Sequence, residues 1–223
     1  MKIVAMSDTH GKHAQIGELP AGDVLVHCGD STMAGTIPEL RSFAKWFGGQ
    51  PHEHKLCIAG NHDFALLGPV GKELLWDYGI TYLEDSQWVS PSGIVFYGSP
   101  WTPKFRNWAF MKKREELAEV WSRIPEDTDV LLTHGGPYGI LDEAPREGGT
   151  FEHVGCEALL ERVARVRPRL HIFGHIHNSY GAEEGYYTMY ANVATCNEAY
   201  QPLNAPWTFD IEDAYHINTV ATS

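Results

Sequence analysis

Near its start the chain reads Lys2-Ile3-Val4-Ala5-Met6-Ser7-Asp8-Thr9-His10, a short apolar run that ends abruptly in polar residues. A continuous apolar run of this length is typical of a strand that is buried on both faces of a sheet. In α/β sheets, ligands bind beyond the carboxyl ends of the strands. The stretch therefore predicts a buried strand and, directly after it, polar side chains in the place where a site belongs.

Four later stretches repeat this pattern of a short apolar run before a polar cluster. They are residues 23–26 before Gly29-Asp30, 55–59 before Gly60-Asn61-His62-Asp63, 130–132 before Thr133-His134, and Leu170–Phe173 before Gly174-His175. Helical patterns lie between several of these runs, at residues 37–47, 111–121 and 152–166. Strands that alternate with helices are typical of a layered α/β protein.

Two further segments have the pattern of antiparallel strands. Residues 87–97 hold the turn sequence Pro91-Ser92-Gly93 between two strand-like runs, and closing strands are predicted around 187–194 and 207–211. We therefore expect an α/β (α+β layered) fold, a mixed β-sheet sandwich flanked by helices. Because the 223 residues contain no linker and no internal repeat, we expect residues 1–223 to form a single domain.

The amino-acid composition argues against several classes of binding partner and indicates where the protein is found. The formal net charge of −12 argues against long nucleic acids and anionic membranes, which bind clustered Lys and Arg. No stretch approaches the roughly 20 apolar residues that span a bilayer. The N-terminus lacks the apolar segment of a secretory signal, and the scattered Cys28, Cys57, Cys156 and Cys196 are typical of small buried thiols, so we expect a cytoplasmic protein. Nothing in the sequence fixes its oligomeric state.

The polar clusters supply carboxylate, imidazole and amide groups and no thiolate. Such groups suit Mn²⁺, Fe and Zn²⁺, among which the residue types do not choose. Where the chain stays extended, alternation would point both ends of Asp8-Thr9-His10 and of His175-Ile176-His177 the same way. Taken singly, each motif has a structural alternative, since Asp30 could form a turn and Asn61 or Asp63 could cap a helix. The remaining histidines are expected to be structural: His13, His27, His52, His54, His153, His171 and His216.

Taken together, the ordered motifs D-x-H, G-D, G-N-H-D, T-H-G and G-H-x-H resemble those of the calcineurin-like metallophosphoesterase superfamily. They extend from Asp8 to His177 and so cover most of the chain. Residues 98–103, 167–177 and Thr195-Cys196 look closer still to the branch of metallophosphoesterase-domain-containing proteins, among the class III cyclic nucleotide phosphodiesterases. Bound cations would attract a small anionic substrate even in an acidic protein.

The resemblance implies two metal ions and the residues that hold them. Asp8, His10 and His177 would hold the first ion, Asn61, His134 and His175 the second, and Asp30 would bridge the two. The resemblance also implies that His62 is the catalytic histidine near the leaving group, oriented by Asp63. Two cations about 3.5 to 4 Å apart deprotonate a bridging water and clamp the phosphoryl oxygens.

The function that this implies is a metal-dependent phosphodiesterase acting on small nucleotides, cyclic ones included. Substrate contacts are predicted for Asn61, His62 and Arg106, the last within the aromatic and basic segment 101–108 (Trp101, Lys104, Phe105, Trp108), which could instead pack onto the core. Tyr138 and Asn178 are further candidates for the pocket lining. The alternatives are a broad phosphomonoesterase or protein phosphatase, a nuclease, which the acidic balance disfavours, and a non-catalytic scaffold on the same fold.

Overall fold

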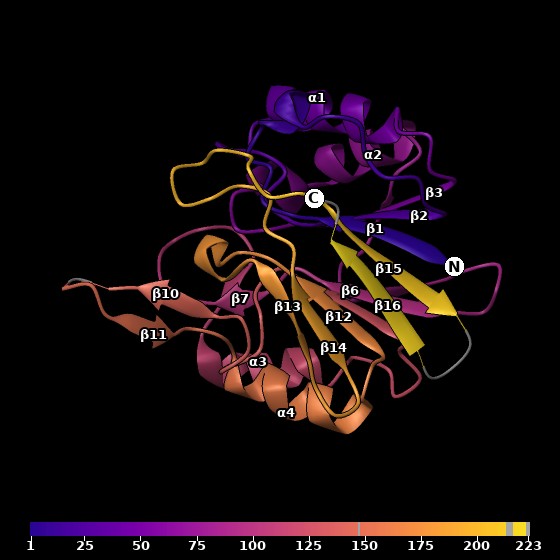
Figure 1. Cartoon of the computed structure of the whole chain (residues 1–223). Coiled ribbons are helices and arrows are strands. Elements are labelled where there is room, and N and C mark those ends of the chain that lie inside the picture. The colour runs from indigo at the N-terminus through magenta and orange to yellow at the C-terminus, as the bar shows by residue number, and fades with distance from the viewer. Residues whose placement is uncertain (147, 213–215, 222–223) are drawn as a thin grey trace.

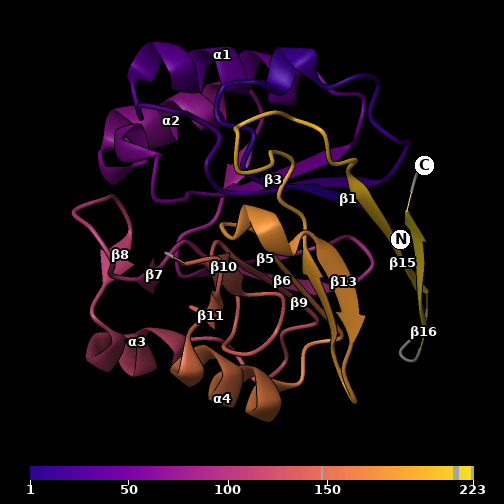
Figure 2. The ribbon, with the colours of Figure 1, turned by 60° about the vertical axis from the view of Figure 1, so that its left-hand side comes forward.

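The computed structural model describes residues 1–146, 148–212 and 216–221. Two six-stranded mixed sheets pack face to face, and helices cover the outer face of each (Figure 1). The strand order is β16-β15-β1-β2-β3-β4 in the first sheet and β13-β14-β12-β9-β6-β5 in the second. Figure 2 shows the resulting four layers from the side, with α1 and α2 above and α3 and α4 below. The predicted sandwich flanked by helices is confirmed.

The first sheet has a parallel centre and an antiparallel edge. Its parallel strands are β1 (Lys2–Met6), β2 (Val24–Cys28), β3 (His54–Ile58) and β4 (Thr81–Tyr82). Strand β15 (Trp207–Glu212) pairs antiparallel with β1, and β16 (His216–Ala221) pairs antiparallel with β15. Helices α1 (Ile37–Gly48) and α2 (Pro69–Asp77) cover this sheet. Helix α1 begins at a capping box, in which Thr36 and Glu39 satisfy each other's backbone amides.

The second sheet also has a parallel centre. Its parallel strands are β6 (Val95–Ser99), β9 (Val130–Thr133), β12 (Leu170–Phe173) and β14 (Met189–Asn192). Strands β5 (Ser86–Val89) and β13 (Gly181–Glu184) are the antiparallel edges. Helices α3 (Arg114–Trp121) and α4 (Glu157–Val166) cover the outer face. Among the described residues, no helix combines the length and the hydrophobicity that crossing a membrane requires.

Two short strand pairs and three 3-10 turns of the described chain lie outside the two sheets and the four helices. Strands β7 (Thr102–Pro103) and β8 (Met111–Lys112) form a short parallel pair. Strands β10 (Glu143–Pro145) and β11 (Phe151–His153) form an antiparallel hairpin that projects from the body (Figure 1). Single 3-10 turns form at η1 (His13–Gln15), η2 (Phe64–Leu67) and η3 (His177–Ser179).

The continuous apolar runs arise because the central strands are buried on both faces. Ile3 and Val26 point into the core between the sheets, whereas Val4 and Leu25 pack under α1 and α2. In the second sheet Leu132 points into the same core and Leu131 packs under α3 and α4. Side chains alternate along a strand, so a strand between two apolar layers needs an apolar residue at every position.

The structure corrects several predicted elements. Helix α3 begins at Arg114 rather than at 111, because Met111–Lys112 pairs with β7 and the Glu116 carboxylate then caps the amide of Lys113. Helix α4 begins at Glu157 rather than at 152, because Phe151–His153 belongs to the hairpin. Strand β14, expected to be antiparallel, pairs antiparallel with β13 and parallel with β12, and helix α2 was not predicted. The predicted hairpin between β5 and β6 is confirmed.

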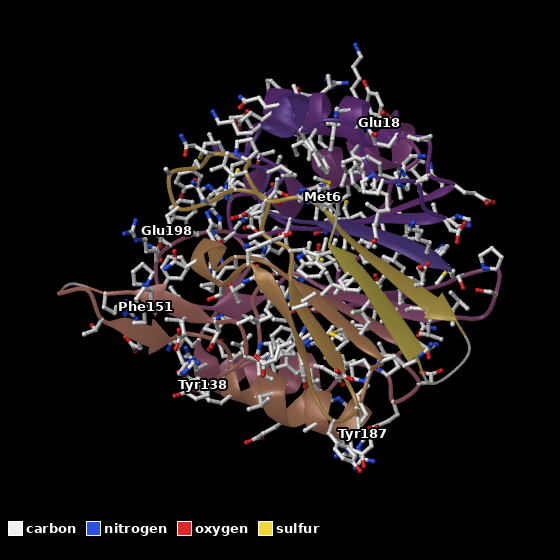
Figure 3. The ribbon with its side chains drawn as sticks, viewed as in Figure 1. Met6, Glu18, Tyr138, Phe151, Tyr187 and Glu198 are labelled. Atoms are coloured by element: carbon white, nitrogen blue, oxygen red, sulfur yellow. The ribbon has the colours of Figure 1, made fainter. Side chains whose placement is uncertain are left out.

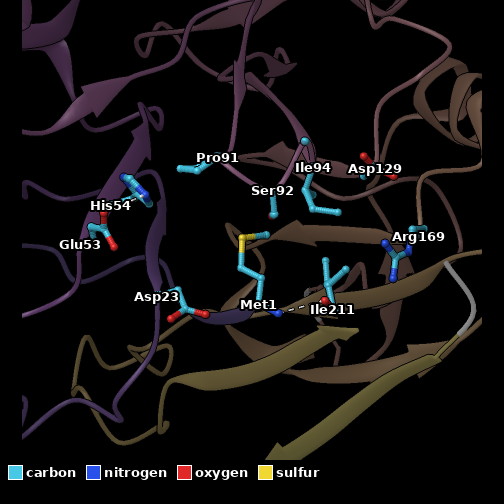
Figure 4. A pocket seen from close by; sticks show the side chains of 11 residues that line it. Met1, Asp23, Glu53, His54, Pro91, Ser92, Ile94, Asp129, Arg169 and Ile211 are labelled. Atoms are coloured by element: carbon cyan, nitrogen blue, oxygen red, sulfur yellow. Dashed lines mark hydrogen bonds and ion pairs between the residues drawn. The ribbon is translucent and has the colours of Figure 1, made fainter. Parts of the chain in front are cut away.

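The two ends of the sandwich are both open. At the amino ends of the strands lies a hollow of about 860 Å³, lined among others by Met1, Asp23, Glu53, Asp129 and Arg169. Figure 4 shows its charged side chains spread around the rim, with Asp23 and Glu53 on one side and Asp129 and Arg169 on the other. The candidate residues of the sequence motifs lie at the opposite end.

Candidate metal centre

The candidate side chains leave the carboxyl ends of strands from both sheets. Asp8 and His10 follow β1, Asp30 follows β2, and Asn61 and His62 follow β3. From the second sheet, His134 follows β9 and His175 and His177 follow β12. The site is therefore built across the seam between the two sheets, and the structure brings these side chains together.

The first group of ligand atoms comes from Asp8, His10 and His177. The Nε2 atoms of His10 and His177 are 3.2 Å apart, and Asp8 Oδ1 lies 3.5 Å from His177 Nε2 and 3.9 Å from His10 Nε2. Metal–ligand bonds of about 2.0 to 2.2 Å place ligands that share an ion roughly 3 to 3.5 Å apart. These three side chains therefore have the spacing of a shared cation site.

The second group comes from Asp30, Asn61, His134 and His175. His134 Nε2 lies 3.5 Å from Asp30 Oδ2 and 3.1 Å from Asn61 Oδ1, and the rings of His134 and His175 are 4.9 Å apart. Asp30 Oδ2 is also 3.8 Å from His10 Nε2 in the first group. The Asp30 carboxylate thus stands between the two groups.

Left-handed backbone, rather than an extended chain, directs these side chains. The φ angles are 54° at Asp8, 43° at His10, 55° at Asp30 and 70° at His175. Such angles cost a residue with a Cβ about 1 to 3 kcal/mol, so the surroundings must hold them. Hydrogen bonds do so: Asp8 N donates to Gly29 O, His10 N to Asp30 O, and His175 N to Asp8 Oδ2, each at 2.9 Å. The predicted convergence is present, but the alternation argument for it was wrong.

Two glycines allow the carboxylates to lie against the backbone. A Cβ built on Gly60 would collide with Asp30 Oδ1, and one built on Gly174 would collide with Asp8 Oδ2. Any larger residue would push a carboxylate out of its group. The glycines before Asn61 and His175 in the sequence motifs are therefore explained by close approach to Asp30 and Asp8.

The charges of the cluster suit cation binding. Burial acts to raise the pKa of Asp8 and of Asp30, but the nearby His177 and His134 outweigh it and hold both pKa values well below the usual range. Burial lowers the pKa of His10 to about 4 and that of His175 to about 3, so both rings are neutral. Burial also acts to lower the pKa of His134, but the Asp30 carboxylate outweighs it and raises this pKa to about 9, so a cation must displace that proton.

The strongest observation in favour of a metal ion at this site is a carboxylate oxygen that has no hydrogen-bond partner among the described residues. Asp8 Oδ1 is buried and, within the described part of the chain, has no hydrogen-bond partner. Leaving such an atom unpaired costs about 1 to 3 kcal/mol or more, which a cation at the first group would remove. The ring nitrogens farther from the cluster are anchored, since His134 Nδ1 donates to Cys28 O at 2.9 Å and His177 Nδ1 to Asn197 O at 3.0 Å. Each Nε2 is thereby aimed inward.

His62 is held by a group that the sequence did not indicate. Its Nδ1 donates to Met33 O at 2.6 Å, which turns Nε2 toward Asp30 Oδ2, 3.9 Å away. Trp108 packs against the ring at 4.1 Å between centroids. The orienting contact expected from the Asp63 carboxylate is absent among the described residues.

The Asp63 carboxylate instead ties two loops together. It accepts from the amides of Gly60, Ser31 and Thr32 at 2.9, 3.2 and 3.0 Å and from the hydroxyls of Ser31 and Thr32 at 2.9 and 2.7 Å. These donors belong to the loops after β2 and β3. Asp63 therefore fixes the position of the backbone that carries Asp30, Asn61 and His62.

A cavity of about 320 Å³ lies over the cluster. Three residues of segment 101–108 line it, namely Phe105, Arg106 and Trp108. Trp101 does not, since its ring packs on Phe110 and its Nε1 donates to Asp85, so for this residue the alternative of packing onto the core is correct. Tyr138 and Asn178 are not among the lining residues.

Two lining residues, Glu198 and Tyr200, were missed. The Tyr200 ring lies 4.8 Å from that of His10 and 5.6 Å from that of His177. Both come from the loop between β14 and β15, in which Figure 3 labels Glu198. The stretch Thr195-Cys196 of the family resemblance lies in this loop, but no motif includes Glu198 or Tyr200.

The histidines expected to be structural lie outside the cluster wherever their side chains are described. His13, His27 and His171 are buried against the hydroxyls of Ser42, Thr9 and Thr133. His52 contacts Pro20 O, His153 contacts Asp142, and His54 lies at the amino-end hollow. The side chain of His216 is outside the described part of the structure. The four cysteines are buried and unbridged.

Comparison with known proteins agrees with this geometry. The sequence profile described as Calcineurin-like phosphoesterase matches residues 1–179, the region that holds every candidate ligand. The chain belongs to this family. The phosphoesterase is similar to metallophosphoesterase domain-containing protein 1 of Homo sapiens, with 40% identity over 235 residues that cover 94% of this chain and 71% of the relative.

Solved structures of low identity support the fold of the phosphoesterase. One crystal structure, with 14% identity, covers 100% of this chain and 99% of its own with a TM-score of 0.71. The structure of TT1561 from Thermus thermophilus, with 13% identity, covers 86% of this chain and 88% of its own with a TM-score of 0.56. The family hydrolyses phosphoesters with a dinuclear metal centre, and this chain has the matching ligand clusters.

Proposed function

We propose that the phosphoesterase is a phosphodiesterase that hydrolyses small nucleotides, cyclic ones included, with two metal ions. Asp8, His10 and His177 would hold one ion, and Asn61, His134 and His175 the other. Asp30 would bridge them, and its position carries the proposal, because one oxygen lies 3.8 Å from His10 Nε2 and 3.5 Å from His134 Nε2. The ligand set suits Mn²⁺, Fe or Zn²⁺.

The ions, when bound, would lower the pKa of water and polarise the phosphoryl oxygens. The chain would contribute the remaining steps. Because Met33 O accepts from His62 Nδ1, the Nε2 atom faces the cavity, where in the protonated ring it can donate to the oxygen of the leaving group. Asn61 and the exposed Arg106 line the same cavity and would contact the phosphate.

Aromatic rings around the cavity support a nucleotide as the substrate. Phe105, Trp108 and Tyr200 line its wall and can stack on a base, a contact worth about 1 to 3 kcal/mol. Residues 1–223 would form one catalytic domain, which is supported by the candidate ligands that both sheets contribute. Its location in the cytoplasm is supported by four buried cysteines that form no disulfide.

The experiment compares a diester with a monoester. Bis-p-nitrophenyl phosphate and p-nitrophenyl phosphate are assayed with added Mn²⁺ and with chelator, followed by 2′,3′-cyclic and 3′,5′-cyclic nucleotides. We expect faster hydrolysis of the diester and loss of activity with chelator. A preference for the monoester would indicate a phosphomonoesterase, and no hydrolysis of either compound would indicate a scaffold.

The His62→Ala variant tests the leaving-group role within the same assay. Loss of general acid assistance should lower kcat for a cyclic nucleotide, whose leaving group is an alkoxide that must gain a proton, by about 10² to 10⁴. The variant should still bind two metal ions per chain, measured by elemental analysis, because His62 is outside both ligand groups. His54→Gln, at the amino-end hollow, is the control and should keep full activity. Unchanged turnover in His62→Ala would refute the role.

A further inference from the structure

A second hollow adjoins the cavity over the metal centre. Its volume is about 520 Å³, larger than the 320 Å³ of the cavity beside it. The two share Phe105 and His175 in their lining, and the rings of these residues lie 5.6 Å apart. A substrate bound at the centre can therefore extend past the Phe105 ring into this second space.

The second hollow is bounded by the projecting β10–β11 hairpin on its outer side. Arg146, Glu152 and His153 come from the hairpin, and Lys104 and Arg114 come from the body of the protein. Figure 3 shows the hairpin, labelled at Phe151, extending away from the helices below it. A hollow between a body and a projecting arm is open to a substrate from one side.

The lining of this hollow is positive in a protein of net charge −12. Lys104, Arg114 and Arg146 contribute three positive charges, of which Glu157 pairs with that of Arg114 and Glu152 with that of Arg146, so the positive charge of Lys104 remains without an ion-pair partner among the described residues. Hydrogen bonding to the Asp142 carboxylate raises the pKa of His153, and the protonated ring together with this carboxylate adds no net charge to the hollow. The hollow at the amino ends is richer in carboxylates, with those of Asp23, Glu53 and Asp129 beside the guanidinium of Arg169.

The arginines are held in position and the lysine is available. Arg114 donates to Gly155 O at 2.7 Å and to Val154 O at 2.9 Å, and it pairs with Glu157. Arg146 pairs with Glu152 across the hairpin. Within the residues that the structure describes, the Lys104 ammonium has neither a hydrogen bond nor an ion pair. A fixed pair of guanidinium groups beside a free ammonium is a suitable environment for an anion.

We propose that this basic pocket, lined by Lys104, Arg114, Arg146 and His153, is a second anion subsite of the active site. It binds a further phosphate or carboxylate of a substrate whose scissile phosphate lies at the metal centre, and Phe105 contacts the group that joins the two. This inference rests on the proposed phosphodiesterase function. Hydrogen bonds between charged groups are each worth a factor of about 10 to 100 in affinity, so the second anion should raise kcat/KM by at least that factor at low salt.

A matched pair of substrates tests the subsite. Thymidine 5′-(p-nitrophenyl phosphate) and the same compound with an added 3′-phosphate differ by one anionic group. We expect kcat/KM to be about 10- to 100-fold higher for the compound with the 3′-phosphate, and the ratio to fall as salt is raised. The double variant Lys104→Gln, Arg146→Gln should bring the ratio close to one. The control double variant Arg41→Gln, Lys45→Gln, which removes two exposed cations from α1, should keep the ratio.

A binding measurement separates this proposal from the proposed function. Calorimetry on the metal-loaded protein compares thymidine 3′,5′-bisphosphate with thymidine 5′-phosphate, and it needs no turnover. Tighter binding of the bisphosphate that the Lys104, Arg146 double variant loses supports the subsite even if neither nitrophenyl ester is hydrolysed. Equal binding, or a preference that the double variant keeps, overturns the subsite even if both esters are hydrolysed.

Discussion

The two open ends of the same sandwich differ in what their polar groups do. The amino-end hollow is larger, about 860 Å³ against 320 Å³, yet two of its carboxylates accept hydrogen bonds from backbone amides and the third, that of Glu53, is exposed. Asp23 accepts from Lys2 N at 2.7 Å and Asp129 from Val95 N at 2.9 Å. At the carboxyl ends, the buried Asp8 Oδ1 has no partner among the described residues and faces two histidines. Convergent unsatisfied groups, and not volume, distinguish the end that can hold metal.

The largest expected effect comes from the bridging carboxylate. Asp30→Asn should lower kcat/KM for bis-p-nitrophenyl phosphate by at least about 10³, because both ions lose a charged ligand and metal assistance is worth several kcal/mol. Elemental analysis should find fewer than two ions per chain. Glu53→Gln at the amino-end hollow, where the side chain is exposed, should change neither quantity. If Asp30→Asn kept two bound ions and full activity, the carboxyl ends of the strands would not be the end that holds the metal ions.

A stability measurement sharpens the same contrast. Asp63→Ala leaves five buried donors of the loops after β2 and β3 without their acceptor, so we expect a loss of about 3 to 5 kcal/mol in the free energy of unfolding. Asp129→Ala at the other end removes one backbone hydrogen bond, which is worth about 0.5 to 1.5 kcal/mol. Urea unfolding of both variants gives the comparison. Equal losses would mean that Asp63 does not organise its end.

The sequence predicted the part of the molecule that repeats a simple physical pattern. Apolar runs such as Ile3 to Met6 define the buried strands, and the polar residues after them converge because parallel strands end at one edge. Helix α2 was missed because Pro69 and Gly71 interrupt its pattern, although Gly71 is needed for contact with Ala65. The starts of α3 and α4 were misplaced because residues 111–112 and 151–153 pair with β7 and β10, and pairings of two or three residues leave no periodic pattern in the sequence.

Within the site, the ligand groups could be predicted and their supports could not. The support of His62 is a backbone carbonyl, that of Met33, and a carbonyl has no signature in a sequence. Tyr200 enters the cavity from a loop whose path depends on where β15 pairs. Asp63 has the residue type of a catalytic partner, and only its five donors reveal that it braces the loops.

The smallest expected effect is on the pH dependence of the free energy of unfolding, and it comes from two buried histidines in the strands that join the two ends. Burial lowers the pKa of both His27 and His171 to about 3, below the ordinary value of 6.5, so between these limits the unfolded chain binds protons that the folded chain does not. Stability is therefore present above about pH 6.5 and falls as the pH is lowered toward 3, by about 1.4 kcal/mol per pH unit for each histidine. Urea unfolding between pH 4.5 and 6 should give a slope that is smaller by one proton in His171→Gln. An unchanged slope would show that His171 takes up no proton on unfolding.

At Asp8, His10, Asp30 and His175 the left-handed backbone lowers the stability of the fold, while the side chains at the same positions supply the candidate metal ligands. Glycine adopts such angles without strain, so replacing His175 with glycine would relax the chain while it deletes a ligand. Selection for thermal robustness alone would drift toward glycine at these positions, and only selection for turnover would keep the side chains. A library screened first for melting temperature and then for hydrolysis should separate the two pressures at these four residues.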